Sequence, residues 1–280
     1  MTEAWDEPTG IAPRGTVIVA AGRGETTAAY GRFGRRLAAD GYRVRVLADV
    51  SADVEASLAA AGKLLVDDAL PAPKVVVGSD TGALFARKLA ERRAPGLDAL
   101  ILAGLPVATA TQPVAPAPQP AASATEPAAA GTRPASPGTQ PATPATAVAS
   151  PGTRPVAAIT LPDWDAELEA RSACPTHRGV LGNGGVTPGA LFSSPIPTEL
   201  IGDSGFRTDL PTLGLHGDAD PVSPLAAARA GYPATLVAIA GGRHDVLNDV
   251  THRSVAATIV LFLERLRLGA DLPEIARVVA

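Results

Sequence analysis

Residues 75–84 read Val-Val-Val-Gly-Ser-Asp-Thr-Gly-Ala-Leu and carry the strongest signal for the fold. Three β-branched valines stop at Gly78, and Gly82 follows four positions later, where an amphipathic helix pattern begins. This pattern predicts a buried strand, a sharp turn and a helix. Glycine suits both flanking positions, because such a turn is strained and its backbone packs closely on its neighbours. The side chain between them, Asp80, is therefore predicted to project out of the turn.

Strand and helix patterns alternate on both sides of this turn. Strands are expected over 15–21, 42–47, 74–78, 97–104, 213–217 and 234–240, and helices over 30–40, 52–65, 82–92, within 162–181 and over 252–268. The alternation predicts an α/β fold with a mainly parallel sheet and helices on both faces. Ligands of such sheets bind outside the carboxyl ends of the strands.

The alternation is interrupted in the middle of the chain. Residues 107–158 are almost entirely Ala, Pro, Thr, Ser, Gln and Gly, so they cannot bury enough apolar surface to offset their ordering entropy. We predict a core over 1–106 and 208–280, a disordered low-complexity insertion over 107–158, and a small cap segment over 159–207. The insertion has two interpretations, an expansion without function or a tether that binds a partner.

Composition excludes several classes of function. The chain has 280 residues, a net charge of −4 and a single cysteine, Cys174. The charge gives no reason to expect nucleic acid or an anionic membrane as partner, and one cysteine fits a reducing compartment. Residues 1–13 lack the pattern of a signal peptide, and no apolar run has the length of a membrane span. We expect a cytoplasmic protein that acts on a small molecule; the sequence does not indicate its oligomeric state.

No cofactor is expected either. Four histidines are scattered without the spacing of metal ligands. Gly22-Arg23-Gly24 lacks the third glycine of a dinucleotide-binding fingerprint.

Three loops at predicted strand ends supply an acid, a second acid and a histidine, in that order. They are Asp80 in the turn, Asp220 in the loop 216–224, and His244 in the Gly-rich loop 241–245. Each has a simpler interpretation. Asp80 is also a good N-cap for its helix, Asp220 and Asp218 are typical turn residues, and His244 is also compatible with an ordinary loop.

With these motifs the chain resembles the α/β-hydrolase superfamily, over residues of about 15–105 and 208–268. Gly78-Ser79-Asp80-Thr81-Gly82 matches the nucleophile elbow of that family except at its centre, where most members have Ser. The resemblance implies an acid at Asp220, a catalytic histidine at His244, and an oxyanion hole formed by the backbone N–H groups of Arg23 and Thr81. Ala21 stands where the family has histidine before the glycine of the oxyanion segment.

An aspartate at the elbow changes the expected chemistry. Its carboxyl, with an unperturbed pKa of about 3.9, is already ionised at neutral pH and needs no base before attack. The Asp80–Asp220–His244 set resembles that of haloalkane dehalogenases and epoxide hydrolases, which implies attack by Asp80 to form an ester that His244 hydrolyses with activated water. Thr81 stands where those dehalogenases have Trp, and the predicted cap has none of the tyrosines of the epoxide hydrolases. An acyl substrate, with Asp80 as nucleophile or as base, also stays open.

The predicted cap adds further candidates for substrate binding. Trp164 suits the wall of an apolar pocket, and His177 with Arg178 suits an anionic group of the substrate. The alternative is that Arg178 pairs with a nearby acid and His177 is a solvated helix residue. Two other functions remain open, namely non-covalent proton transfer by Asp80 and His244 in a lyase, isomerase or cyclase, and ligand binding without catalysis.

Overall fold

The computed structural model describes residues 3–107, 164–202, 206–232 and 235–277. The predicted insertion over 107–158 lies outside the described residues except for Val107, as do the first five positions of the predicted cap. The described strands are β1 (Glu3–Trp5), β2 (Gly15–Ala20), β3 (Tyr42–Leu47), β4 (Lys74–Ser79), β5 (Ala99–Ala103), β6 (Thr212–Gly217) and β7 (Thr235–Ile239).

The helices fall into longer elements and single turns. The longer ones are α1 (Gly31–Ala39), α2 (Val54–Leu65), α3 (Thr81–Glu91), α4 (Trp164–Arg171), α5 (Pro175–Val180) and α8 (His252–Leu268). The shorter ones are α6 (Ala190–Ser193), α7 (Leu225–Ala228), η1 (Thr27–Tyr30), η2 (Leu181–Gly185), η3 (Thr198–Leu200), η4 (Arg229–Gly231) and η5 (Val246–Asn248).

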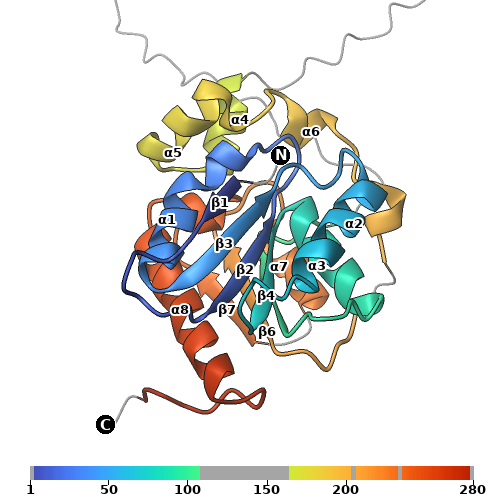
Figure 1. Cartoon of the computed structure of the whole chain (residues 1–280). Helices are drawn as coiled ribbons and strands as arrows, with labels where there is room; N and C mark the ends of the chain where they lie inside the picture. Colours follow the sequence, from blue (N-terminus) through green and yellow to red (C-terminus); the bar gives the residue numbers. More distant parts are fainter. Residues whose placement is uncertain (1–2, 108–163, 203–205, 233–234, 278–280) are drawn as a thin grey trace, which may run out of the picture. The chain divides into compact units, whose positions relative to one another are not determined.

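The strands form one sheet in the order β1-β3-β2-β4-β5-β6-β7 over the described part of the chain. All neighbours are parallel except the edge pair β1 and β3. Helices α1 and α8 cover one face, while α2 and α3 cover the other (Figure 1). The predicted class, a mainly parallel sheet with helices on both faces, is therefore confirmed.

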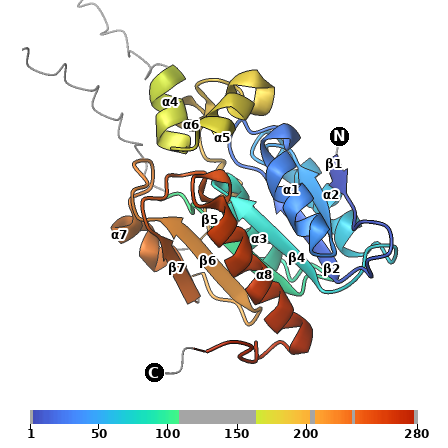
Figure 2. The same ribbon diagram turned by 90° about the vertical axis from the view of Figure 1, so that its left-hand side faces the viewer.

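Burial on both faces explains the continuous apolar runs of the strands. In β2, Val17 and Val19 pack beneath α1 and α8, whereas Ile18 and Ala20 pack beneath α2 and α3. Successive side chains of a strand point to opposite faces, so a strand that is covered twice needs apolar residues at every position. Helices α4, α5 and α6 lie beyond the carboxyl ends of the strands, at one end of the sheet (Figure 2).

The structure differs from the sequence-based expectation at two places. The edge strand β1 was not predicted; Trp5 packs against Gly34 of α1, where even a β-carbon would lie within 2.2 Å of the indole. The helix expected within 162–181 is divided into α4 and α5, because Pro175 cannot continue α4 and instead occupies the first turn of α5.

The turn after β4 has the predicted strand-turn-helix form. Asp80 adopts φ 52° and ψ −123°, a region that non-glycine residues seldom occupy. Its two glycines make room for this backbone. A β-carbon at Gly78 would lie 2.0 Å from the carbonyl oxygen of Gly82, and one at Gly82 would lie 1.9 Å from that of Ala20. The turn therefore exists only where both positions lack a side chain.

We expect Gly82→Ala to destabilise the fold by about 1–3 kcal/mol, because the added methyl group overlaps backbone that cannot move away. The matched control is Gly62→Ala in α2, where an added β-carbon meets nothing within 4 Å. That change should stabilise the protein by about 0.5–1 kcal/mol through helix propensity. Urea unfolding of both variants checks the pair, and equal stability of Gly82→Ala and the unchanged protein would contradict the close approach.

Candidate active site

The side chains of Asp80, Asp220 and His244 meet at the carboxyl ends of the strands. His244 Nδ1 lies 2.8 Å from Asp220 Oδ2, and its Nε2 lies 3.2 Å from Asp80 Oδ1. Asp80 follows β4, Asp220 follows β6, and His244 follows β7. All three are buried, with Asp80 and His244 each only 1% exposed. The structure thus brings together the three residues that sequence order alone had grouped.

Asp80 does not act as a cap for α3. Its side chain makes no hydrogen bond to the first amides of that helix, although its backbone is fixed by bonds to Ala103 and Ala83. The strained backbone turns the carboxylate away from the helix and toward His244. The N-cap interpretation of Asp80 is therefore wrong.

Asp220 serves both roles that its sequence context suggested. Oδ1 accepts hydrogen bonds from the amides of Val222 and Ser223, at 2.8 and 3.0 Å, and so fixes its own turn. Oδ2 faces the imidazole of His244. Asp218, by contrast, accepts from the amide of Gly241 at an exposed position, as expected of a turn residue.

Arg23 holds Asp80 with its backbone and with its side chain. Its amide donates to Asp80 Oδ2 at 3.0 Å, Nε donates to the same oxygen at 2.8 Å, and Nη2 donates to Oδ1 at 2.8 Å. The resemblance implied a role for the amide of Arg23 in an oxyanion hole, which stays a prediction, and it implied no role for the side chain. Gly22 permits this approach, since a β-carbon there would lie 2.7 Å from that of Asp80.

Thr81, unlike Arg23, does not hold the carboxylate of Asp80. Its amide donates no hydrogen bond to Asp80 within the described residues, and its buried hydroxyl has no partner there. The second donor on Asp80 Oδ2 is the Nε of Arg23. The role of Thr81 in an oxyanion hole stays a prediction.

The charges in the cluster fix its protonation states. Burial opposes ionisation of Asp80, but the charges and hydrogen bonds of Arg23 and His244 outweigh it and hold the pKa of this carboxyl well below its usual range. Burial likewise opposes protonation of His244, but Asp220 and Asp80 raise its pKa to about 10. The resting state therefore contains an ionised Asp80 between two cations, a guanidinium and an imidazolium.

A second buried cluster lies beneath the Arg23 loop and centres on Arg171 at the end of α4. Arg171 Nη2 donates to the carbonyl oxygen of Arg23 at 2.8 Å, and Nε donates to Glu167 at 3.1 Å. Its Nη1 lies 3.6 Å from a carboxylate oxygen of Glu25 and from one of Asp245. Arg171 thereby links α4 to the loop that holds Asp80. The signal in the sequence is an arginine on a helix whose other charges are mostly acidic.

Glu25 closes the same loop from the other side. Its Oε2 accepts from the amide of Gly22 at 2.7 Å and from the hydroxyl of Tyr30 at 2.5 Å. Burial, together with the charge of Asp245, raises the pKa of Glu25 to about 7. A carboxyl with this pKa is partly neutral under ordinary conditions.

The structure does not bring the cap candidates to Asp80. His177 is buried rather than solvated, and its Nε2 lies 3.4 Å from Asp245. Arg178 donates from Nε to the carbonyl oxygen of Ser172 and not to an acid. Trp164 is partly buried and packs against the apolar core. Substrate binding by these three residues stays a prediction without a contact to support it.

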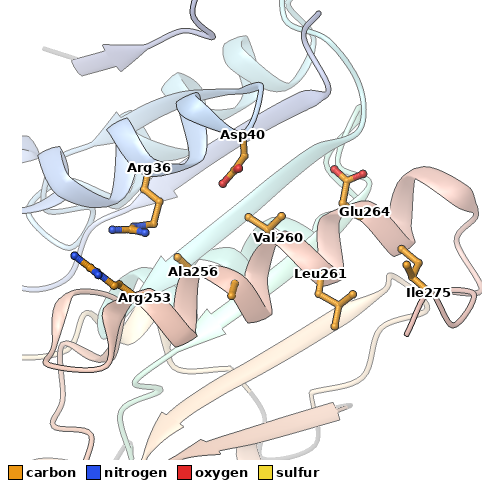
Figure 3. A pocket seen from close by; sticks show the side chains of 9 residues that line it. Arg36, Asp40, Arg253, Ala256, Val260, Leu261, Glu264 and Ile275 are labelled. Atoms are coloured by element: carbon orange, nitrogen blue, oxygen red, sulfur yellow. The ribbon is translucent and has the colours of Figure 1, made fainter. Parts of the chain in front are cut away.

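Other features of the described residues lie apart from this cluster. Figure 3 shows a pocket of about 410 Å³ beside α1 and α8, whose lining includes Arg36, Asp40, Arg253, Val260, Glu264 and Ile275 and none of the candidate residues. Across the described ranges, no group of His, Cys, Asp and Glu has an arrangement that could hold a metal ion. None of the helices in those ranges is long and apolar enough to cross a membrane.

Solved structures of other proteins share this architecture. A monoacylglycerol lipase from Paleococcus ferrophilus superposes with a TM-score of 0.60 at 15% identity, covering 94% of this chain and 97% of the lipase. An enol-lactonase from Burkholderia xenovorans (TM-score 0.57, 14% identity, 94% and 96% covered) and an esterase from a Rhodococcus species (0.56, 15%, 94% and 94%) are similar too. The chain has the α/β-hydrolase fold. No family model matches its sequence, and no curated protein matches it.

These likenesses, at 15% identity or less, concern the fold alone. They place the Asp80 turn in an architecture that lipases and esterases use, but they do not say what Asp80 does. The chemistry has to be argued from the cluster itself.

The raised pKa of Glu25 predicts a pH dependence of stability. Its folded pKa of about 7 exceeds the value of 4.5 for an unperturbed Glu, so the native state binds more protons between these limits. The contribution of Glu25 to stability therefore falls as pH rises through this window. Glu25→Gln keeps an acceptor but cannot ionise. It should match the unchanged protein near pH 5 and exceed it near pH 8, by about 1–3 kcal/mol.

Urea unfolding at the two pH values measures this effect. The matched control is Glu199→Gln on η3, an exposed position, which should leave the pH dependence of stability unchanged. A Glu25→Gln variant that is less stable than the unchanged protein at pH 8 would show that the charge of Glu25 stabilises the loop.

Proposed function

We propose that this protein is a hydrolase of small organic molecules in which Asp80 is the nucleophile. The observation that carries the proposal is that the two oxygens of Asp80 have different sets of hydrogen-bond partners. Oδ1 faces His244 Nε2 and accepts from Nη2 of Arg23, whereas Oδ2 accepts from the amide and the Nε of Arg23. We assign the attack on the substrate to Oδ1 and the stabilisation of developing charge to Oδ2.

In the first step a lone pair of Asp80 Oδ1 attacks a carbon of the substrate. The bond from this carbon to its leaving group breaks, and the leaving group departs with the bonding electrons. Asp80 becomes a neutral ester. No base is required, because the carboxylate is already ionised.

Before the second step His244 releases its proton to solvent, because ester formation has removed the charge of Asp80. The neutral Nε2 then takes a proton from water, whose oxygen bonds to Asp80 Cγ. Negative charge develops on Oδ2, where the amide and the Nε of Arg23 donate hydrogen bonds. The tetrahedral intermediate collapses, the Cγ–Oδ1 bond breaks, and the product alkoxide receives the proton from His244. Asp80 is left as a carboxylic acid and returns to its ionised form by passing its proton to His244. Asp220 orients the imidazole and stabilises its charged form.

The described structure corresponds to a closed state of such a site. Arg23 is fully buried, and the cap segment lies over its loop, where the amide of Thr187 donates to Gly24 and the Nη1 of Arg23 donates to Ser194. A substrate reaches Oδ1 only when the 186–194 segment or the Arg23 side chain shifts. Lids that close over a reaction exclude competing water, and we assign this role to the 186–194 segment.

A trapped intermediate tests the proposal. His244→Gln removes the base of the second step but leaves the nucleophile, so the ester should accumulate on Asp80. We would incubate this variant with two probes that give an alkyl ester, 1-bromobutane and styrene oxide, and analyse the tryptic peptide 75–87 by mass spectrometry. An adduct on Asp80 that is absent from Asp80→Asn/His244→Gln supports the mechanism. Turnover by the unchanged protein with no adduct in the variant would reject a covalent step.

The pH dependence of the two steps should differ. Asp80 stays ionised from pH 5 to 9, so the rate of ester formation should be constant in this range. Ester hydrolysis needs neutral His244, whose pKa is about 10 in the resting state and falls when the ester removes the charge of Asp80. Rapid quenching should therefore find more esterified protein at pH 5 than at pH 9. The opposite order would contradict the role of His244 as base.

One observation favours a second candidate, a ligand-binding protein without catalysis. Both Asp80 oxygens accept from the same buried guanidinium, which is the geometry of a structural ion pair. That candidate predicts no adduct, no turnover of any probe, and ligand affinity that survives Asp80→Ala and His244→Ala. Non-covalent proton transfer by Asp80 and His244 in a lyase or isomerase predicts turnover without an adduct.

A further inference from the structure

We propose that loss of the charge on Asp80 converts Arg23 into a buried anion site, and that this site receives an anionic group of the substrate. The group is either the departing leaving group or a fixed carboxylate. The use of the site during reaction rests on the proposed function. Its substrates would then be organic molecules that carry a carboxylate or that expel a stable anion such as a halide.

The first ground is that one acid balances the positive charge of Arg23 within the described residues. Its guanidinium is fully buried, and Asp80 is the one acid with which it forms an ion pair among the described residues. Its Nη1 has a single neutral acceptor, the carbonyl oxygen of Ser194 at 3.4 Å. Asp49 is the next acid that acts on Arg23, but its oxygens are held by the amides of Gly24 and Ser51.

The second ground is that ester formation changes the hydrogen bonds between Arg23 and Asp80. Nε and the amide of Arg23 keep their acceptor, because Oδ2 becomes the ester carbonyl oxygen. Nη2 keeps only a poor and uncharged acceptor, because Oδ1 is now the alkoxy oxygen of an ester. A buried guanidinium is then left with no counter-charge, which is a strongly unfavourable state.

An anion next to the guanidinium removes this cost. When the leaving group departs with the bonding electrons, the negative charge of Asp80 is transferred to it, and the total charge around Arg23 is unchanged. A guanidinium is also suited to carboxylates, which it binds through two parallel hydrogen bonds. The positive charge of nearby Arg171 also acts on Arg23, and it further favours an anion at this position.

The test needs no turnover. Asp80→Asn reproduces the charge of the ester, since the amide oxygen can take the place of Oδ2 while the NH₂ group offers nothing to Nη2. We would measure thermal unfolding of this variant with increasing sodium bromide or sodium acetate, at an ionic strength held constant with sodium HEPES, whose sulfonate is carried on a bulky molecule. Either anion should stabilise Asp80→Asn, with an affinity at least about tenfold above that for the unchanged protein, where Asp80 occupies the guanidinium.

Two further variants make the result decisive. Asp80→Asn/Arg23→Met should lose the response to both anions. Asp80→Ser, which restores the residue usual at this turn, is the alternative background if the asparagine variant does not fold, and should respond in the same way. Stronger stabilisation by bromide assigns the site to the leaving group, and stronger stabilisation by acetate assigns it to a carboxylate of the substrate.

Equal responses of Asp80→Asn and the unchanged protein, or a response that persists without Arg23, would overturn the inference. The anion-binding test and the adduct test of the proposed function can fail independently of each other. Anion binding by Asp80→Asn with no adduct in His244→Gln retains the anion site and rejects the covalent mechanism. An adduct without anion binding rejects the anion site alone.

Discussion

The buried pairing of Arg23 with Asp80 is the constraint on which the arrangement of this site depends. An ionised carboxylate that is 1% exposed is stable only with compensating charge and hydrogen bonds, and Arg23 supplies three of these bonds while His244 faces the remaining side. The strained backbone of Asp80 aims the carboxylate at both partners. Removal of either cation would leave buried charge uncompensated, so the cluster has to be considered as a unit.

The surrounding loops act mainly to keep Arg23 in place. Glu25 holds the amide of Gly22, Asp49 holds that of Gly24, and Arg171 holds the carbonyl group of Arg23. These contacts come from the loop before η1, from the loop after β3 and from α4. The cap segment is thus joined to the elbow through backbone and charge, and the orientation of the guanidinium follows from this frame. A site built in this way is preorganised, since its donors need no rearrangement when charge develops on Oδ2.

The sequence predicted the sheet and the meeting of Asp80, Asp220 and His244, because strand periodicity is local and parallel strands end at one edge. It did not predict the side-chain role of Arg23, which joins residues 57 positions apart, or that of Arg171, which contacts a residue 148 positions away. Such contacts depend on side-chain direction in the folded state, which no local pattern encodes. The short strand β1 was missed because three residues carry no periodicity, and the break between α4 and α5 was missed although Pro175 marks it.

The central claim, that Asp80 is a nucleophile that is regenerated by water, is tested most directly by isotope transfer. A single turnover of 1-bromobutane by excess protein in ¹⁸O-labelled water should place one labelled oxygen in the peptide 75–87 and release unlabelled alcohol. Water attacks Asp80 Cγ in that mechanism, and the alcohol keeps the original Asp80 oxygen. Labelled alcohol with an unlabelled peptide would contradict the account, because it requires direct attack of water on the substrate.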